Sequence, residues 1–190
     1  MSIKLRATPA SAWTLVELMM SVGGFSIAGL ALAIIFLFSV RSYTALANYA
    51  VLDQYNRQAR DTLTHELRQA QKITGYTSNA TSSSLSLING AGVNVTYTFD
   101  ANQQQFRRSA SDGSGKVLLT NCALLNFGLF MRPPTNGSFE VYPVNLNTNW
   151  QQTVKVVEVT WKTGMTISPT MNVNSEDIQT ARIVIRKQQK

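Results

Sequence analysis

Few residues in this sequence could carry out catalysis, because the chain of 190 residues has one histidine and one cysteine. His65 follows Asp61 by four residues, a spacing that predicts a pair on a helix surface instead of a general base. Cys122 has no second cysteine to pair with and no neighbouring histidine, so we expect a small, partly buried residue. A zinc site would lack its usual ligands. No phosphate-binding glycine loop, nucleophile elbow or calcium loop is present in the sequence. We therefore expect no catalytic residue, metal site or cofactor, and a protein that is not an enzyme.

Glu17 is the one charged residue between Arg6 and Arg41, and it begins a long apolar segment. Residues 18–40 would reach about 34 Å as a helix, and the hydrocarbon core of a bilayer is about 30 Å thick. The composition therefore predicts a membrane-spanning helix. A carboxylate at the edge of hydrocarbon is costly and needs a partner. We expect such a partner for Glu17; the alternative is a side chain that simply lies among the lipid headgroups.

The flanks of this segment predict a retained anchor with its N-terminus in the cytoplasm. Lys4 and Arg6 precede the span, and no acidic residue occurs among the first sixteen residues, which favours a cytoplasmic start and an exported remainder. A cleaved secretory signal peptide has a shorter apolar stretch, of about 7–15 residues, followed by a small-x-small site. Residues 45–47 could supply such a site, and cleavage there would make Asn48 the first residue of a secreted protein.

The sequence at the start of the span resembles the processing site of type IV pilin-like precursors. In that family a short basic leader precedes a small residue, an aromatic residue, Thr-Leu-Val/Ile and Glu. The resemblance implies cleavage between Ala12 and Trp13 by a membrane-embedded prepilin peptidase, and N-methylation of Trp13. Ala12 stands where glycine is usual, and Trp13 where phenylalanine is usual. The resemblance also implies that Glu17 pairs with the N-terminal amine of a neighbouring subunit, and assigns the assembly segment to Thr14, Leu15, Val16 and Glu17.

The helical pattern continues beyond the membrane segment. Apolar residues recur at three- and four-residue steps, which predicts one stripe on an amphipathic helix. Asp53, Arg57 and Asp61 lie four residues apart and predict a charged ladder on another face. Gly75 is a candidate helix stop, so we expect one helix from about 14 to 74. The predicted stripe consists of Leu52, Tyr55, Ala59, Leu63, Leu67 and Ala70.

The remaining residues predict a β-rich head, and hence an α+β fold with a long N-terminal helix packed on a mostly antiparallel sheet. Residues 77–84 are expected to be a polar linker. Alternating apolar residues separated by turn-forming runs then predict a series of short strands. The expected strands lie near 85–87, 93–99, 106–108, 116–119, 126–131, 139–144, 154–161 and 183–185, with a loop at 145–150.

Two further segments resemble one branch of the pilin-like family. Residues 61–70 resemble the helix of J-type minor pseudopilins and their PilW-like relatives, in which the pattern L-x-x-D/E-L-R-Q-A recurs. Residues 156–161, followed by Gly164 and a closing basic strand, resemble the C-terminal hairpin of that group. The resemblance implies a subunit near the tip of a fibre, in complex with other minor subunits.

The formal net charge of +7 raises nucleic acid as a partner. The candidate contacts are Arg107, Arg108, Arg182, Arg186 and Lys187. Removal of a leader that carries Lys4 and Arg6 would lower the charge to +5, which is ordinary for a soluble surface. We therefore expect these residues to lie on a solvated face, with DNA contact as the minor alternative.

Taken together, the sequence predicts a leader at 1–12, a transmembrane helix at 13–40, an amphipathic extracytoplasmic helix at 41–75 and a β-rich head at 76–190. The resemblance implies a minor pilin or pseudopilin that assembles from the inner membrane into a type IV pilus-like fibre or a type II secretion pseudopilus. Its implied partners are prepilin peptidase, major and minor pilin or pseudopilin subunits, and inner-membrane lipid. The alternative is a single-pass, signal-anchored extracytoplasmic binding protein or adhesin that is not built into a fibre.

Overall fold

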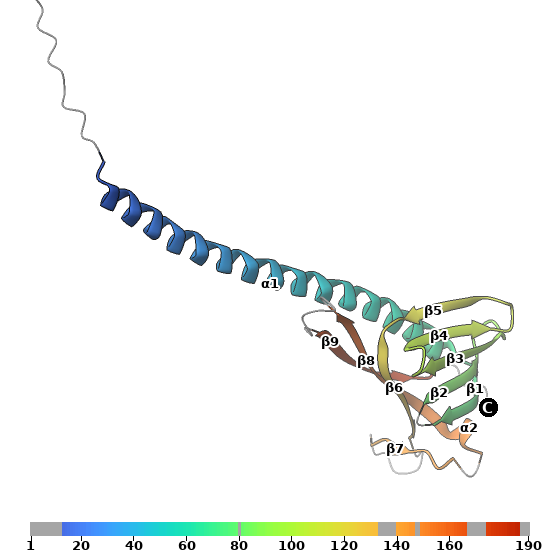
Figure 1. The fold of residues 1–190 in the computed structure, drawn as a ribbon. Coiled ribbons are helices and arrows are strands. Elements are labelled where there is room, and N and C mark those ends of the chain that lie inside the picture. The colour runs from blue at the N-terminus through green and yellow to red at the C-terminus, as the bar shows by residue number, and fades with distance from the viewer. Residues whose placement is uncertain (1–12, 80, 133–139, 147–148, 167–173, 187–190) are drawn as a thin grey trace, which may run out of the picture. The chain divides into compact units, whose positions relative to one another are not determined.

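The computed structural model describes residues 13–79, 81–132, 140–146, 149–166 and 174–186. The chain divides into two compact units, Met1–Thr44 and Ala45–Lys190. Helix α1 (Leu15–Gln69) begins in the first unit and ends in the second, and the described strands belong to the second (Figure 1). The fold is α+β, with a long apolar N-terminal helix and antiparallel sheets, as the sequence predicts.

The described strands of the second unit form two antiparallel sheets instead of one. The first has the order β1-β2-β3-β4-β5, in which every neighbour is also the next strand along the chain. The second has the order β7-β6-β8-β9. The strand bounds are β1 Lys72–Ser78, β2 Ser82–Ile88, β3 Asn94–Asp100, β4 Gln105–Ala110, β5 Gly115–Leu119, β6 Cys122–Met131, β7 Tyr142–Pro143, β8 Val154–Thr166 and β9 Asn174–Val184.

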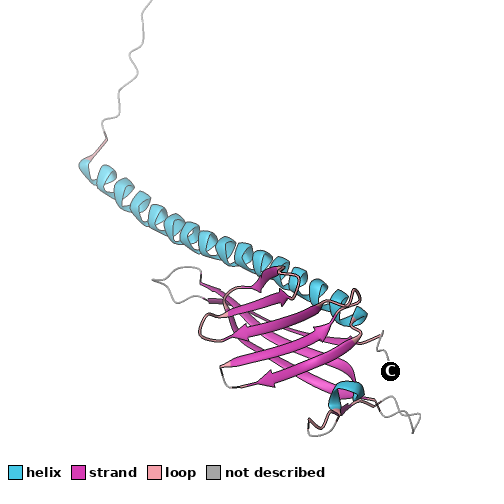
Figure 2. Ribbon diagram, turned by 90° about the vertical axis from the view of Figure 1, so that its right-hand side faces the viewer, coloured by secondary structure: helices cyan, strands magenta, loops and turns pink. Residues whose placement is uncertain are grey.

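The C-terminal part of α1 packs along both sheets, which Figure 2 shows as two layers of strands. Its buried residues recur at three- and four-residue steps, so the predicted apolar stripe is confirmed in its main members. Leu63 and Leu67 are fully buried, and each such side chain contributes about 1.5–3 kcal/mol. Tyr55, however, is 51% exposed, and its place on the stripe is taken by the polar residue Asn56, which is 2% exposed.

Asn56 is buried because polar groups of the second sheet satisfy its amide. Its Oδ1 accepts the indole N–H of Trp161 at 2.9 Å, and its Nδ2 donates to Thr163 Oγ1 at 3.1 Å. The Nδ2 also donates to the carboxylate of Asp177 at 2.7 Å. A buried amide with partners of this kind fixes the position of the helix against β8 and β9.

The predicted helix end at 74 is wrong, because α1 ends at Gln69 and residues 72–75 belong to β1. The N–H of Gln71 already donates to the carbonyl of Ile88 in β2, at 2.9 Å. Ile73 is fully buried as a strand residue. Gly75 is a strand residue at a shift in register and not a helix stop. The apolar spacing of the helix continues to Ala70, and the residues that follow pair with β2 instead of extending the helix.

The prediction of a polar linker at 77–84 is also wrong, because most of this segment belongs to the β1–β2 hairpin. Its hydroxyl groups bond across strands. Thr77 Oγ1 lies 2.5 Å from Ser84 Oγ, and Ser86 Oγ lies 3.0 Å from Thr96 Oγ1. Ser83 faces the interior and is 3% exposed. Cross-strand hydroxyl pairs stabilise a sheet without apolar side chains. The polar composition of residues 77–84 therefore gave no indication that they form strands.

The remaining strand predictions are confirmed in position, with differences at the ends. Strand β8 runs five residues beyond the predicted 161. Residues 183–185 were expected to lie within the last strand; β9 contains Ile183 and Val184 and ends before Ile185. A short helix, α2 (Trp150–Thr153), starts where a loop was predicted. Of the predicted strand at 139–144, only β7 is formed among the described residues, and Phe139 lies outside them. The core joins both sheets, with the rings of Phe106 and Phe127 6.2 Å apart.

Candidate functional site

The residues at the start of α1 form a reciprocal hydrogen-bonded cap. The backbone N–H and the hydroxyl of Thr14 both donate to Glu17 Oε2, each at 3.2 Å. The N–H of Glu17 donates to Thr14 Oγ1 at 3.3 Å. The spacing Thr-x-x-Glu is the capping-box pattern, in which two otherwise unpaired donors of the first turn are satisfied. The carboxylate of Glu17 also lies where the helix dipole favours negative charge.

The apolar part of α1 satisfies its own polar groups. The hydroxyls of Ser21, Ser26 and Ser39 donate to the backbone carbonyls four residues earlier, at 2.8, 2.7 and 2.9 Å. A hydroxyl bonded in this way needs no water, which suits a helix in lipid. The length and apolar composition of the helix allow it to cross a membrane, and none of its most apolar window is buried.

A second uncharged stretch of α1 follows the predicted span, beyond Arg41. Residues 42–52 contain no charged side chain. Tyr43, Leu46 and Tyr49 are 77%, 69% and 47% exposed. Trp13, at the other end of the span, is 71% exposed. Aromatic residues at both ends of an apolar helix are typical of membrane–water interfaces.

A partly buried ion pair joins the amphipathic part of α1 to the first sheet. Arg108 Nη2 lies 2.8 Å from Glu66 Oε1, and both side chains are less than one-fifth exposed. Tyr97 donates its hydroxyl to Glu66 Oε2 at 2.5 Å. Burial raises the pKa of Tyr97 far above its usual range, and the bond to Glu66 raises it further. The bond to Glu66 likewise raises the pKa of Arg108. This cluster fixes the helix against β3 and β4.

Two of the arginines predicted as candidate DNA contacts have acidic partners within the chain. Arg108 pairs with Glu66, and Arg182 lies 2.6 Å from Glu158 across the β8–β9 ladder. Arg107 is exposed and donates to Gln105 of its own strand. Arg186 is exposed beyond the end of β9, and Lys187 lies outside the described residues.

The two candidate catalytic residues lie far from a reactive arrangement. His65 is exposed on α1, and its Nε2 lies 3.1 Å from the side-chain amide of Gln69, not beside Asp61. Cys122 is fully buried, and its thiol donates to the carbonyl of Leu124 at 3.3 Å. Burial raises the pKa of Cys122 to about 11, which disfavours the reactive thiolate. Within the described ranges, no three His, Cys, Asp or Glu side chains lie close enough to hold a metal ion.

The structure thus gathers part of the predicted site. Thr14 and Glu17 contact each other, Trp13 is exposed beside them, and Leu15 and Val16 are exposed on the first turn. Ala12 and the predicted leader lie outside the described residues. The capping role of Thr14 was missed, although the Thr-x-x-Glu spacing signals it. Neither the models of known protein families nor the curated proteins match this chain.

Proposed function

We propose that this chain is a minor pilin or pseudopilin, a membrane-anchored subunit that assembles from the inner membrane into a pilus-like or pseudopilus fibre. Its mechanism is assembly and not chemistry. The apolar part of α1 holds the subunit in the bilayer, with the N-terminus cytoplasmic and the head outside. Prepilin peptidase cleaves between Ala12 and Trp13 and methylates the new amine, and the fibre places the head beside other minor subunits.

The observation that carries the proposal is the length of exposed, mostly apolar helix surface, which a single charged residue, Arg41, interrupts. Residues 18–40 reach about 34 Å, which already matches a hydrocarbon core of about 30 Å. Residues 42–52 add about 16 Å more, with Tyr43, Leu46 and Tyr49 exposed. Exposed apolar surface of this extent is costly in water. Apolar helices of neighbouring subunits would cover it in a fibre.

Glu17 would couple extraction from lipid to assembly. In the single subunit its carboxylate is satisfied by the N–H and hydroxyl of Thr14. Cleavage before Trp13 would create a free amine one helical turn from Glu17. In a bundle of helices, where the dielectric constant is low, the amine of one subunit and the carboxylate of the next would stabilise each other. An unpaired charge there would be costly.

The identity of the first residue of the mature protein tests the proposal against its alternatives. The chain should be isolated from its own membrane and its N-terminal peptide identified by mass spectrometry. The proposal predicts N-methylated Trp13. An intact Met1 would contradict it and indicate a single-pass, signal-anchored binding protein or adhesin. Asn48 as the first residue would indicate a secreted protein without an anchor.

A further inference from the structure

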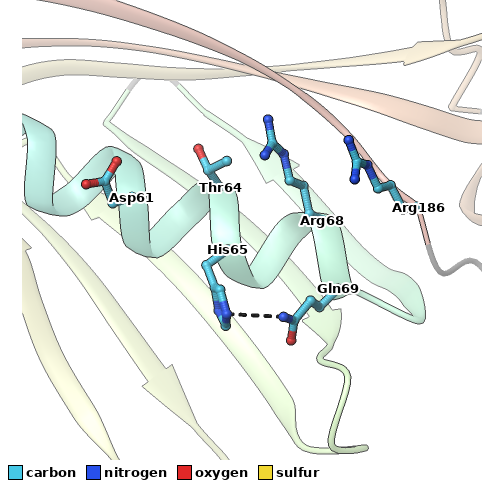
Figure 3. Close-up of a pocket in the computed structure, with 6 residues that line it drawn as sticks. All are labelled: Asp61, Thr64, His65, Arg68, Gln69 and Arg186. Carbon is cyan, nitrogen blue, oxygen red and sulfur yellow. Dashed lines mark hydrogen bonds between the residues drawn. The ribbon is translucent and has the colours of Figure 1, made fainter.

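Two arginine side chains from different elements lie together at the end of α1. Arg68 is in the last turn of the helix, and Arg186 follows β9. The backbone N–H of Arg186 donates to the carbonyl of Arg68 at 3.2 Å, which joins the two segments. Figure 3 shows both guanidinium groups extending to the same side of the helix. Both side chains are exposed.

Within the described part of the chain, these two arginines have no acidic partner, unlike several other arginines. Arg57, Arg108 and Arg182 have carboxylate oxygens at 2.9, 2.8 and 2.6 Å. Among the residues that the structure describes, none forms an ion pair with Arg68 or Arg186. Two guanidinium groups that line the same hollow repel each other, and an anion between them would relieve that repulsion.

A hollow of about 420 Å³ lies beside the pair. Its charge is uneven along the helix. Asp61 lies two helical turns before Arg68, about 10 Å along the axis, and its carboxylate is 3.9 Å from Arg60 Nε. The end with Arg68 and Arg186 is therefore positive, whereas the charge of Asp61 at the other end is partly offset by Arg60. The lining residues are Asp61, Thr64, His65, Arg68, Gln69 and Arg186.

We propose that this hollow binds an acidic side chain of a neighbouring subunit, with Arg68 and Arg186 as its carboxylate receptor. A guanidinium group matches the geometry of a carboxylate and can bind it through two hydrogen bonds. The identity of the partner as a fibre subunit rests on the proposed function, but the chemistry of the hollow does not.

The charge of the hollow distinguishes this partner from a nucleic acid. Nucleic-acid binding draws its affinity from several phosphate contacts along a basic surface. Here two arginines line the hollow, which is enough for one carboxylate but too few for several phosphate contacts.

The test uses the full chain in its own membrane, with the photoreactive residue p-benzoylphenylalanine at position 64. Thr64 lies in the hollow between Asp61 and Arg68 (Figure 3). We expect a cross-link to a peptide that contains Asp or Glu. The double substitution Arg68→Glu/Arg186→Glu should lower its yield about tenfold or more, because charged hydrogen bonds are lost. Arg107→Glu, an exposed arginine on β4, is the matched control and should leave the yield unchanged.

Rescue makes the test specific. In the partner protein, the Asp or Glu of the cross-linked peptide is replaced by Arg. This replacement should restore the cross-linking yield with the Arg68→Glu/Arg186→Glu variant. Absence of a cross-link, a yield unchanged in the double variant, or cross-linking to DNA would overturn the proposal. The experiment distinguishes failure of the proposed carboxylate receptor from failure of the proposed function. An arginine-dependent cross-link to a protein outside any fibre would support the receptor and contradict fibre membership. A cross-link to a fibre subunit with a yield independent of both arginines would support fibre membership and contradict the receptor.

Discussion

The side-chain amide of Asn56 accepts the indole N–H of Trp161 at 2.9 Å, although 105 residues separate them. Both residues are at most 2% exposed. This bond joins the amphipathic part of α1 to β8 of the second sheet. The helix is thus fixed to the second sheet through a buried polar contact, as the Glu66–Arg108 pair fixes it to the first.

Asn56→Ala should destabilise the head, because it strands the indole N–H of Trp161 and the hydroxyl of Thr163 in the core. We expect the free energy of unfolding to fall by about 1–3 kcal/mol for a stranded donor. Urea unfolding of the full chain in a mild detergent measures the change. Gln58→Ala is the matched control on an exposed position of the same helix, and should cost less than about 0.5 kcal/mol. Equal stability of the two variants would refute a structural role for the amide.

Tyr97 predicts a loss of stability at alkaline pH. Its pKa in the folded state is raised, first by burial and then by the bond to Glu66, and the unfolded value is about 10. Its contribution is therefore fully present below about pH 10 and is lost as pH rises through the higher folded value. Between the wild type and Tyr97→Phe, the difference in unfolding free energy should be constant from pH 7 to 9. It should then change by up to about 1.4 kcal/mol per pH unit above pH 10. Parallel curves for the two proteins across this range would contradict the assignment.

Sequence periodicity was sufficient to predict α1, the buried faces of Leu63 and Leu67, and an antiparallel head. It could not predict Asn56, because a polar residue on an apolar stripe becomes favourable only when distant partners satisfy it. The hairpin around Ser83 was missed for a related reason, since hydroxyl pairs across strands carry no hydrophobic alternation. In the candidate site, the Thr14–Glu17 cap could have been predicted from the Thr-x-x-Glu spacing, although it was missed. The pairing of Glu66 with Arg108, 42 residues apart, depends on the tertiary fold and had no local signal.

Ala12 tests the position of the cleavage site. Because the peptidase must accommodate a small residue before its cut, Ala12→Gly should be processed at least as well as the wild type. Ala12→Leu should remain in the membrane with its leader attached. The two forms are separated by the mass of the leader in membrane fractions. Normal cleavage before Trp13 in Ala12→Leu would show that the site is placed wrongly.

Glu17 tests the account most directly. Glu17→Ala should insert into the membrane at least as well as the wild type, because removing a charge beside hydrocarbon lowers the cost of insertion. It should also lose its leader, since the cut lies outside the substituted turn. Incorporation into the fibre should fail, because the amine of a neighbouring subunit then meets no carboxylate.

The deciding measurement is the amount of the chain that co-purifies with sheared fibres, divided by its amount in the membrane, for the wild type, Glu17→Ala and Glu17→Gln. The account predicts equal membrane levels for all three and a loss of fibre association in both variants, which is partial if the subunit has few neighbours at a fibre tip. Wild-type fibre association of Glu17→Ala would contradict the pairing, and with it the proposed mechanism of assembly.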